Sequence, residues 1–163
     1  MRKAQSISDL PAKPAVYALY GGTGRRAYVA YVGITSDLKN RIIQHLIRRD
    51  SSVTTGTSAA TLNPDFVTEV RWWRTGAFRK KVHREAAEIV ALRVLDPTLR
   101  SRGLTTSGAR DLAADPEFQT GMEKLFGGPP EGKLLLPDLQ GALDRIVQLE
   151  ARVGVLESKL KKE

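Results

Sequence analysis

Two residues with side chains suited to phosphate chemistry, Arg41 and His45, lie four positions apart in the first half of the chain. In a helix this spacing puts both on one face, away from the apolar stripe formed by Leu38, Ile42 and Leu46. The planar guanidinium of arginine binds a phosphoryl group through two donors and stays charged. Such a face can meet a phosphate, where Arg41 suits the stabilisation of a pentacovalent transition state and His45 can relay or donate a proton. The alternative for Arg41 is a solvated helix arginine.

Glu88 lies in a second predicted helix, on a face that is otherwise apolar. A carboxylate in such company is costly unless it is paired or bound to a cation. One carboxylate with waters and a substrate phosphate is an ordinary Mg²⁺ arrangement, so we predict that Glu88 binds Mg²⁺ or Mn²⁺. Three alternatives stay open: an ion pair with Arg84, an ion pair with Arg41, and metal binding by Glu85 instead.

Two tyrosines, Tyr17 and Tyr31, fall on neighbouring predicted strands. A phenol titrates near pH 10, so a tyrosine that acts as a base needs a pKa lowered by a nearby cation or metal-bound water. The alternative is that both are structural strand residues with buried rings.

The elements that must position these side chains give an α/β (α+β) fold with a small three-stranded antiparallel sheet flanked by helices. Residues 15–20 and 27–32 are rich in Val, Tyr and Ala and flank a Gly-rich segment, a pattern typical of a β-hairpin. Residues 66–73 supply the third strand. Helices are expected from the capping residues 34–37 to Arg48 and over residues 82–95, with a long surface loop over 51–64.

A resemblance to a known family rests on the hairpin and on the spacing that follows it. Ala15-Val16-Tyr17 and Tyr31-Val32-Gly33 resemble the two strands that name the GIY-YIG endonucleases. Arg41 then follows Gly33 by eight residues, and Glu88 precedes Pro97 by nine, as in the family. The resemblance covers about the first 100 residues.

The resemblance implies a metal-dependent DNA endonuclease. In it, Tyr17 activates the attacking water, Tyr31 orients the phosphate and Glu88 is the metal ligand. The chain departs from the family at Ala15, in place of a glycine, and at Arg100, in place of an asparagine that braces the site. The alternative is therefore a catalytically weak or inactive GIY-YIG-like module that binds nucleic acid or oligomerises.

The charge is concentrated at the front of the chain. Residues 1–110 hold 19 Lys and Arg against 8 Asp and Glu, within a total net charge of +8. Basic proteins attract polyanions, so DNA is the expected partner, with RNA as an alternative substrate. The candidate nucleic-acid-binding residues are Lys39, Arg48, Arg71, Trp73, Arg74, Lys80 and Lys81. Trp72 and Trp73 alternate on a strand, so one of the two is expected to be exposed and able to stack on bases.

The chain is expected to consist of a nuclease domain over residues 1–104, followed by two further segments. Residues 105–133 hold several Gly and Pro and are expected to form a loosely packed connector. Residues 134–163 repeat apolar residues every seven positions, with Arg145 and Arg152 placed to pair with Glu150 and Glu157 of a second copy. This favours a coiled coil and a homodimer or higher homo-oligomer over a helix packed on its own domain.

Composition points to a cytoplasmic protein without a membrane partner. The sequence has no cysteine, no apolar run long enough to cross a bilayer, and no apolar N-terminal stretch of the signal-peptide kind. Any metal must then be held by oxygen or imidazole ligands.

Overall fold

The computed structural model describes residues 1–22, 24–54, 61–100, 105–137, 146–154 and 158. They form a mixed α/β fold around one sheet with the strand order β1-β5-β4-β2-β3. The strands are β1 (Arg2–Ala4), β2 (Ala15–Gly21), β3 (Tyr28–Thr35), β4 (Val67–Trp73) and β5 (Gly132–Leu135). The helices are α1 (Leu38–Ile42), α2 (Lys81–Leu95), α3 (Ser107–Ala114) and α4 (Pro116–Gly127), with the short turns η1 (Ile7–Asp9), η2 (Gly24–Arg26), η3 (Ile43–Arg48), η4 (Pro64–Phe66) and η5 (Gly76–Arg79).

The predicted hairpin and third strand form the antiparallel part of the sheet, with β2 between β3 and β4. The predicted total of three strands is wrong, because β5 pairs with β4 and β1 pairs with β5 in parallel. Both added strands are very short and come from opposite ends of the described domain. Local sequence patterns carry little information about such a pairing.

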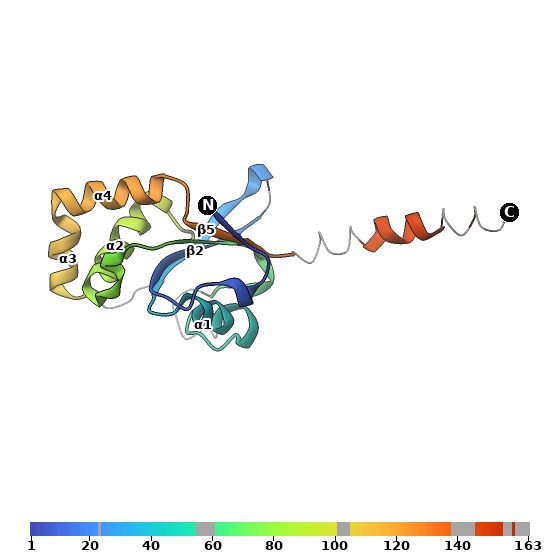
Figure 1. The fold of residues 1–163 in the computed structure, drawn as a ribbon, viewed down its shortest axis with the longest axis horizontal. Coiled ribbons are helices and arrows are strands. Elements are labelled where there is room, and N and C mark those ends of the chain that lie inside the picture. Colours follow the sequence, from blue (N-terminus) through green and yellow to red (C-terminus); the bar gives the residue numbers. More distant parts are fainter. Residues whose placement is uncertain (23, 55–60, 101–104, 138–145, 155–157, 159–163) are drawn as a thin grey trace.

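Helices cover both faces of the sheet (Figure 1). The face of β2 that bears Tyr17 and Leu19 packs against α1 and η3, in one hydrophobic cluster with Trp72. The opposite face bears Val16 and Ala18 and packs against α2, α3 and α4. Every residue of β2 is buried as a result.

The prediction that one tryptophan is exposed is wrong. Trp72 and Trp73 do point to opposite faces of the sheet, but helices or loops cover each face and both residues are buried. The Trp73 ring packs edge-on against Phe126 of α4, with the centroids 5.5 Å apart. Trp73 therefore offers no free ring for stacking on a base.

Residues 105–133 are not the loosely packed connector that we expected. Thr106 and Asp115 cap the N-termini of α3 and α4 through their side chains, with Pro116 in the first turn of α4. The segment buries Ala109, Ala113 and Phe126 against α2 and the sheet. The Gly and Pro residues suggested a loop, whereas the capping residues determine two helix starts.

The helix over residues 38–48 changes from α-helical to π-helical hydrogen bonding at Ile43. Asp37 caps α1 by accepting from the Asn40 backbone N–H at 3.0 Å. From Ile43 the helix continues as the π-helical turn η3, which ends at Arg49 in the left-handed conformation. A π-turn bonds residue i to i+5, so it moves His45 away from the face that a regular α-helix would give it.

In the C-terminal segment, residues 146–154 are helical and exposed. Ile146, Val147, Leu149 and Val153 are each 44–63% exposed, so this stretch does not pack on the domain. The remaining heptad positions lie outside the described residues, and the coiled coil stays a prediction. Within the described part of the chain, no helix has the length and apolar character needed to span a bilayer.

Substitution by alanine is expected to have opposite effects on stability at two glycines, Gly132 and Gly121. A Cβ at Gly132 would lie 2.1 Å from the Trp72 ring, whereas nothing lies within 4 Å of a Cβ at Gly121 in α4. We expect Gly132→Ala to lower the free energy of unfolding by about 2 kcal/mol or more. Gly121→Ala should raise it by about 0.5–1 kcal/mol, because alanine favours a helix interior. Urea unfolding followed by circular dichroism measures both, and equal effects would contradict the packing described.

Candidate active site

Tyr17, Tyr31 and His45 form a triangle of rings on the α1 side of the sheet. The ring centroids are 6.2 Å apart for the two tyrosines and 5.7 Å from each tyrosine to His45. Gly33, the β3 partner of Tyr17, lacks the Cβ that would lie 2.6 Å from the Tyr17 hydroxyl oxygen. A glycine at this position therefore leaves the space that the Tyr17 hydroxyl occupies.

His45 is fully buried, contrary to its predicted place on a helix face away from the apolar stripe. Its ring lies beside Tyr17 and Tyr31, which belong to the same hydrophobic cluster as Leu38 and Ile42. Burial and the nearby charge of Arg41 lower the pKa of His45 to about 3. His45 is therefore a neutral imidazole at physiological pH, with one ring proton.

A hydrogen-bond chain leads from Tyr17 through His45 into the loop after η3. The Tyr17 hydroxyl lies 2.6 Å from His45 Nε2, and His45 Nδ1 lies 2.8 Å from Ser51 Oγ. Ser51 Oγ lies 2.9 Å from Thr54 Oγ1, which donates to the Ser51 carbonyl oxygen at 3.0 Å.

Proton counting gives this chain a direction. The single hydroxyl proton of Thr54 goes to the Ser51 carbonyl, so the Ser51 hydroxyl donates to Thr54 and accepts from His45 Nδ1–H. His45 Nε2 then has a free lone pair that accepts from the Tyr17 hydroxyl. The reverse direction would leave the buried Tyr17 hydroxyl without an acceptor among the contacts described, which is costly.

Ser51 is thus a positioning residue for the His45 tautomer, and Ser51→Ala tests this role. Without the Ser51 oxygen, Nδ1–H loses its acceptor, and the tautomer with the proton on Nε2 gains population. We expect ¹⁵N NMR to detect Nδ1–H in the native protein and a mixture of tautomers in Ser51→Ala. Ser107→Ala, at an exposed serine of α3, should leave the His45 signals unchanged; a native protein protonated at Nε2 would contradict the chain.

The prediction that Tyr17 needs a lowered pKa is not met. Burial and the neighbouring Tyr31 raise the pKa of Tyr17 well above its ordinary value, although Arg41 opposes this shift. Tyr17 is therefore a protonated phenol at neutral pH. It can accept a proton only if it passes its own proton on, and His45 Nε2 is in place to receive it.

Arg41 lies between the two phenols and an open cleft. Burial lowers the pKa of Arg41, but the neighbouring Tyr17 and Tyr31 outweigh this effect and raise it above its ordinary value. Its Nη1 donates to Gln44 Oε1 at 3.1 Å. The guanidinium also lines a cleft of about 360 Å³, whose other basic lining residues are Lys81 and Arg84 of α2. An anion in this cleft meets three cations.

Glu88 lies two turns after Lys81 on α2 and is largely buried. Burial and the nearby charge of Glu85 raise its pKa to about 7, although Arg41 opposes this shift. Glu88 also acts electrostatically on Tyr17, which places it near the triangle of rings. Within the described residues it forms no salt bridge, so a cation would relieve the cost of its charge.

The alternative roles for the neighbours of Glu88 find no support in the contacts. Glu85 accepts from the Thr106 hydroxyl at 2.7 Å and lies 3.5 Å from Lys81 Nζ, which ties α2 to the start of α3. Arg84 donates to the carbonyl oxygens of Phe78 and Arg79. Glu88 is left as the available carboxylate on this face of α2.

In the part of the chain that the structure describes, no three or more His, Asp or Glu side chains are grouped as a ready-made metal site. A lone buried carboxylate fits an ion that keeps much of its hydration and takes further ligands from a substrate, as Mg²⁺ does. It does not fit a metal that needs a full set of protein ligands.

Neither the models of known protein families nor the curated proteins match this sequence.

The candidate nucleic-acid-binding residues differ in their exposure and in the contacts that they make. Arg48, Lys80 and Lys81 have exposed side chains, and Arg74 lines two clefts beside the sheet. Lys39 is tied to the Ser8 carbonyl oxygen at 2.8 Å.

Arg71 has a structural role. It bonds to Glu69 at 2.8 Å and lies over the Tyr20 ring, 4.1 Å from its centroid. Arg100, the departure from the family pattern, forms an exposed ion pair with Asp96 at 2.6 Å.

Sequence reasoning missed Ser51, Thr54 and Gln44. Ser51 and Thr54 lay in a segment read as a long polar loop, where nothing in the local pattern distinguishes a buried serine from an exposed one. A signal for Gln44 was available, because it follows Arg41 at the i,i+3 spacing of helical neighbours.

Proposed function

We propose that this protein is a metal-dependent endonuclease that hydrolyses phosphodiester bonds in DNA. The observation that carries the proposal is the buried Tyr17 hydroxyl, which donates to the neutral His45 and neighbours Arg41, a residue that lines a basic cleft. A phenol linked in this way can accept a proton from water without first ionising. A purely structural protein has no need for such an arrangement next to a largely buried glutamate that forms no salt bridge within the described part of the chain.

Proton transfer in the proposed reaction runs through two groups. Water attacks phosphorus while its proton passes to the Tyr17 oxygen and the Tyr17 proton passes to His45 Nε2. The new O–P bond forms as the P–O bond to the leaving oxygen breaks, and that oxygen takes a proton from solvent. The imidazolium, disfavoured in the free protein, is stabilised by the negative charge that gathers on the phosphate.

Charge stabilisation is assigned to Arg41 and Glu88. Arg41 binds a non-bridging phosphate oxygen from the cleft side, where its charge is partly shielded from water and acts more strongly. Glu88 is the residue that would hold Mg²⁺ or Mn²⁺, and the bound ion would supply further neutralisation of the phosphate. Tyr31 orients the phosphate next to Tyr17.

A plasmid nicking assay tests the proposal. Supercoiled DNA incubated with the protein and Mg²⁺ or Mn²⁺ should become nicked and linear, and EDTA should stop the reaction. A labelled RNA of the same sequence, run in parallel, separates DNA from RNA cleavage. DNA binding without any cleavage in either metal would leave the chain as a binding module and overturn the nuclease proposal.

The C-terminal helix supports a second proposal, that the protein forms a homodimer. Its apolar residues Ile146, Leu149 and Val153 are exposed and follow the heptad spacing. Two copies would bring two sites to one duplex. Gel filtration with light scattering should give twice the monomer mass, and a monomer with and without DNA would remove this proposal.

A further inference from the structure

One end of each of the five strands lies in a row along the same edge of the sheet, the edge that runs across the strands, next to the candidate active site. β1 and β5 are parallel, and each later neighbour in the order β5-β4-β2-β3 is antiparallel. The starts of β1, β5 and β2 therefore lie beside the ends of β4 and β3. The register confirms this, since Gly132 pairs with both Arg2 and Trp72, and Ala15 pairs with Thr35.

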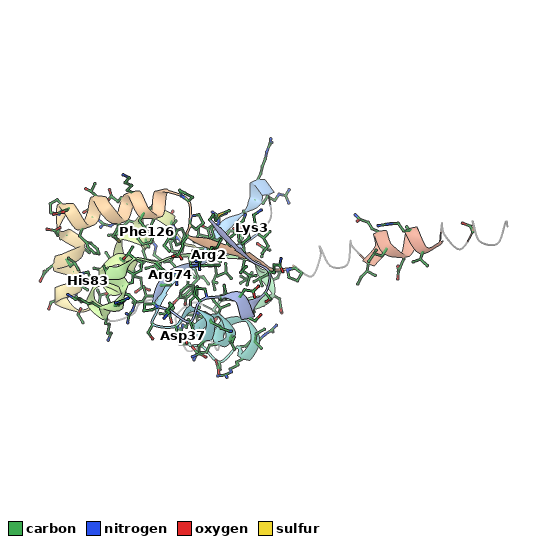
Figure 2. The ribbon with its side chains drawn as sticks, in the orientation of Figure 1. Arg2, Lys3, Asp37, Arg74, His83 and Phe126 are labelled. Carbon is green, nitrogen blue, oxygen red and sulfur yellow. The ribbon has the colours of Figure 1, made fainter. Side chains whose placement is uncertain are left out.

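Three clefts follow one another along this edge. The first, of about 460 Å³, includes Arg2, Lys3 and Arg74. The second, of about 570 Å³, shares Arg74 and adds Lys13 and Arg79. The third is the 360 Å³ cleft that Arg41 lines. Figure 2 labels Arg2, Lys3 and Arg74 near one another in the upper and central part of the domain, with Asp37 below them.

The clefts are basic, and their acidic residues are already engaged. Their linings hold eight Lys and Arg residues against three acids, Asp9, Asp37 and Glu131. The Asp9 and Asp37 carboxylates accept from backbone N–H groups, and Glu131 pairs with Arg74.

Six of the eight cations form no salt bridge within the described residues, and two of these six, Lys13 and Arg79, line the cleft that also includes Thr75. No salt bridge joins Lys13 or Arg79 to a carboxylate within the described ranges of the chain. The buried Thr75 hydroxyl, which has no hydrogen-bond partner there, belongs to the lining of the same cleft. A cleft with free positive charge and an unused hydroxyl donor suits phosphate oxygens.

We propose that this edge, the strand-end groove, binds the nucleic-acid flank on one side of the cleaved bond. The inference rests on the proposed nuclease function, because the active-site cleft is one end of the groove. Four strand intervals of about 4.8 Å give a span of about 19 Å. At about 3.4 Å per base pair along the helix axis, this matches five or six base pairs. An extended polyanion fits three clefts in a row better than a single phosphate does.

The test is binding of a fluorescein-labelled 30-base-pair duplex, without added divalent metal, by Lys13→Ala/Arg79→Ala. Both side chains are exposed, so circular dichroism should show a folded variant. We expect Kd to rise at least tenfold, and the slope of log K against log salt to fall by about 2, for two lost phosphate contacts. Arg25→Ala/Arg26→Ala, which removes the same charge from the exposed hairpin turn, should change Kd less than threefold.

Each outcome separates the two proposals. A selective loss of binding in Lys13→Ala/Arg79→Ala supports the groove even if the native protein cleaves nothing. Equal losses in both double variants, or none in either, would overturn the groove even if cleavage is found. A variant that keeps its affinity for the duplex but loses affinity for vesicles containing phosphatidylserine would overturn it as well.

Discussion

Tyr17→Phe is expected to lower the rate constant of DNA cleavage by about a thousandfold, within the range for loss of a general base. Phenylalanine keeps the ring in its buried place but removes the oxygen that accepts the water proton. His45 Nε2, at 2.6 Å from that oxygen, cannot take over, because the removed atom is its link to the water. Single-turnover cleavage of a labelled duplex with excess protein measures the rate constant without the influence of product release.

The same substitution should also change stability. His45 Nε2 loses its donor in a fully buried position, which costs about 1–2 kcal/mol in the free energy of unfolding. Tyr28→Phe is the matched control, because Tyr28 is 46% exposed and belongs to the same hairpin. It should cleave like the native protein. A rate for Tyr17→Phe within tenfold of the native rate would remove Tyr17 from the mechanism.

Glu88→Gln is expected to abolish metal-dependent cleavage and, in the absence of metal, to stabilise the protein at pH 8. The carboxyl of Glu88 has a pKa of about 7 in the folded protein, against 4.5 for an unperturbed glutamate. A raised folded pKa means that folding favours the protonated form. The stability that this gives is complete below about pH 4.5 and is lost as the pH rises through about 7.

Glutamine remains neutral over this range, so the two proteins should differ little near pH 4 and increasingly above it. The difference in pKa corresponds to at most about 3 kcal/mol at pH 8 in favour of the variant. Urea unfolding at pH 4, 6 and 8 measures the trend. Mg²⁺ should stabilise the native protein and not the variant, because only the carboxylate binds the ion.

Glu85→Gln is a control that is expected to change the free energy of unfolding in the opposite direction. The hydrogen bond from Thr106 lowers the pKa of Glu85, so this substitution should destabilise the protein above the usual pKa of glutamate. If Glu88→Gln were also destabilising at pH 8, Glu88 would not be a buried charge in need of a cation. If it cleaved DNA at the native rate, the metal would be held elsewhere.

Glu88 should also determine how the rate of the proposed cleavage reaction falls at acidic pH. Metal binding requires ionised Glu88, so the rate at low Mg²⁺ should rise with pH towards about 7. His45, with a pKa near 3, stays neutral across this range and adds no second transition. A higher Mg²⁺ concentration should move this transition to lower pH, because the bound ion favours the ionised carboxylate of Glu88.

Local patterns in the sequence determined the hairpin, the third strand and α2. The alternation and turn residues that define β2 and β3 lie within twenty-one residues, from Ala15 to Thr35, so little long-range information is needed to pair them. The helical spacing of apolar residues likewise predicted α2 to within a residue or two of Lys81–Leu95. Three of the five candidate site residues, Tyr17, Tyr31 and Glu88, lie on these elements.

Only the tertiary structure decided the protonation states and the burial that the chemistry depends on. The pKa of Tyr17 rises because its ring is enclosed by the sheet, α1 and η3, and no pattern around Tyr17 reports that enclosure. His45 points into the core because of a π-turn, and its partner Ser51 comes from the next loop. β1 and β5 add the strand ends of the groove by pairing across the length of the domain. These features depend on contacts between segments distant in the sequence, which local spacing cannot specify.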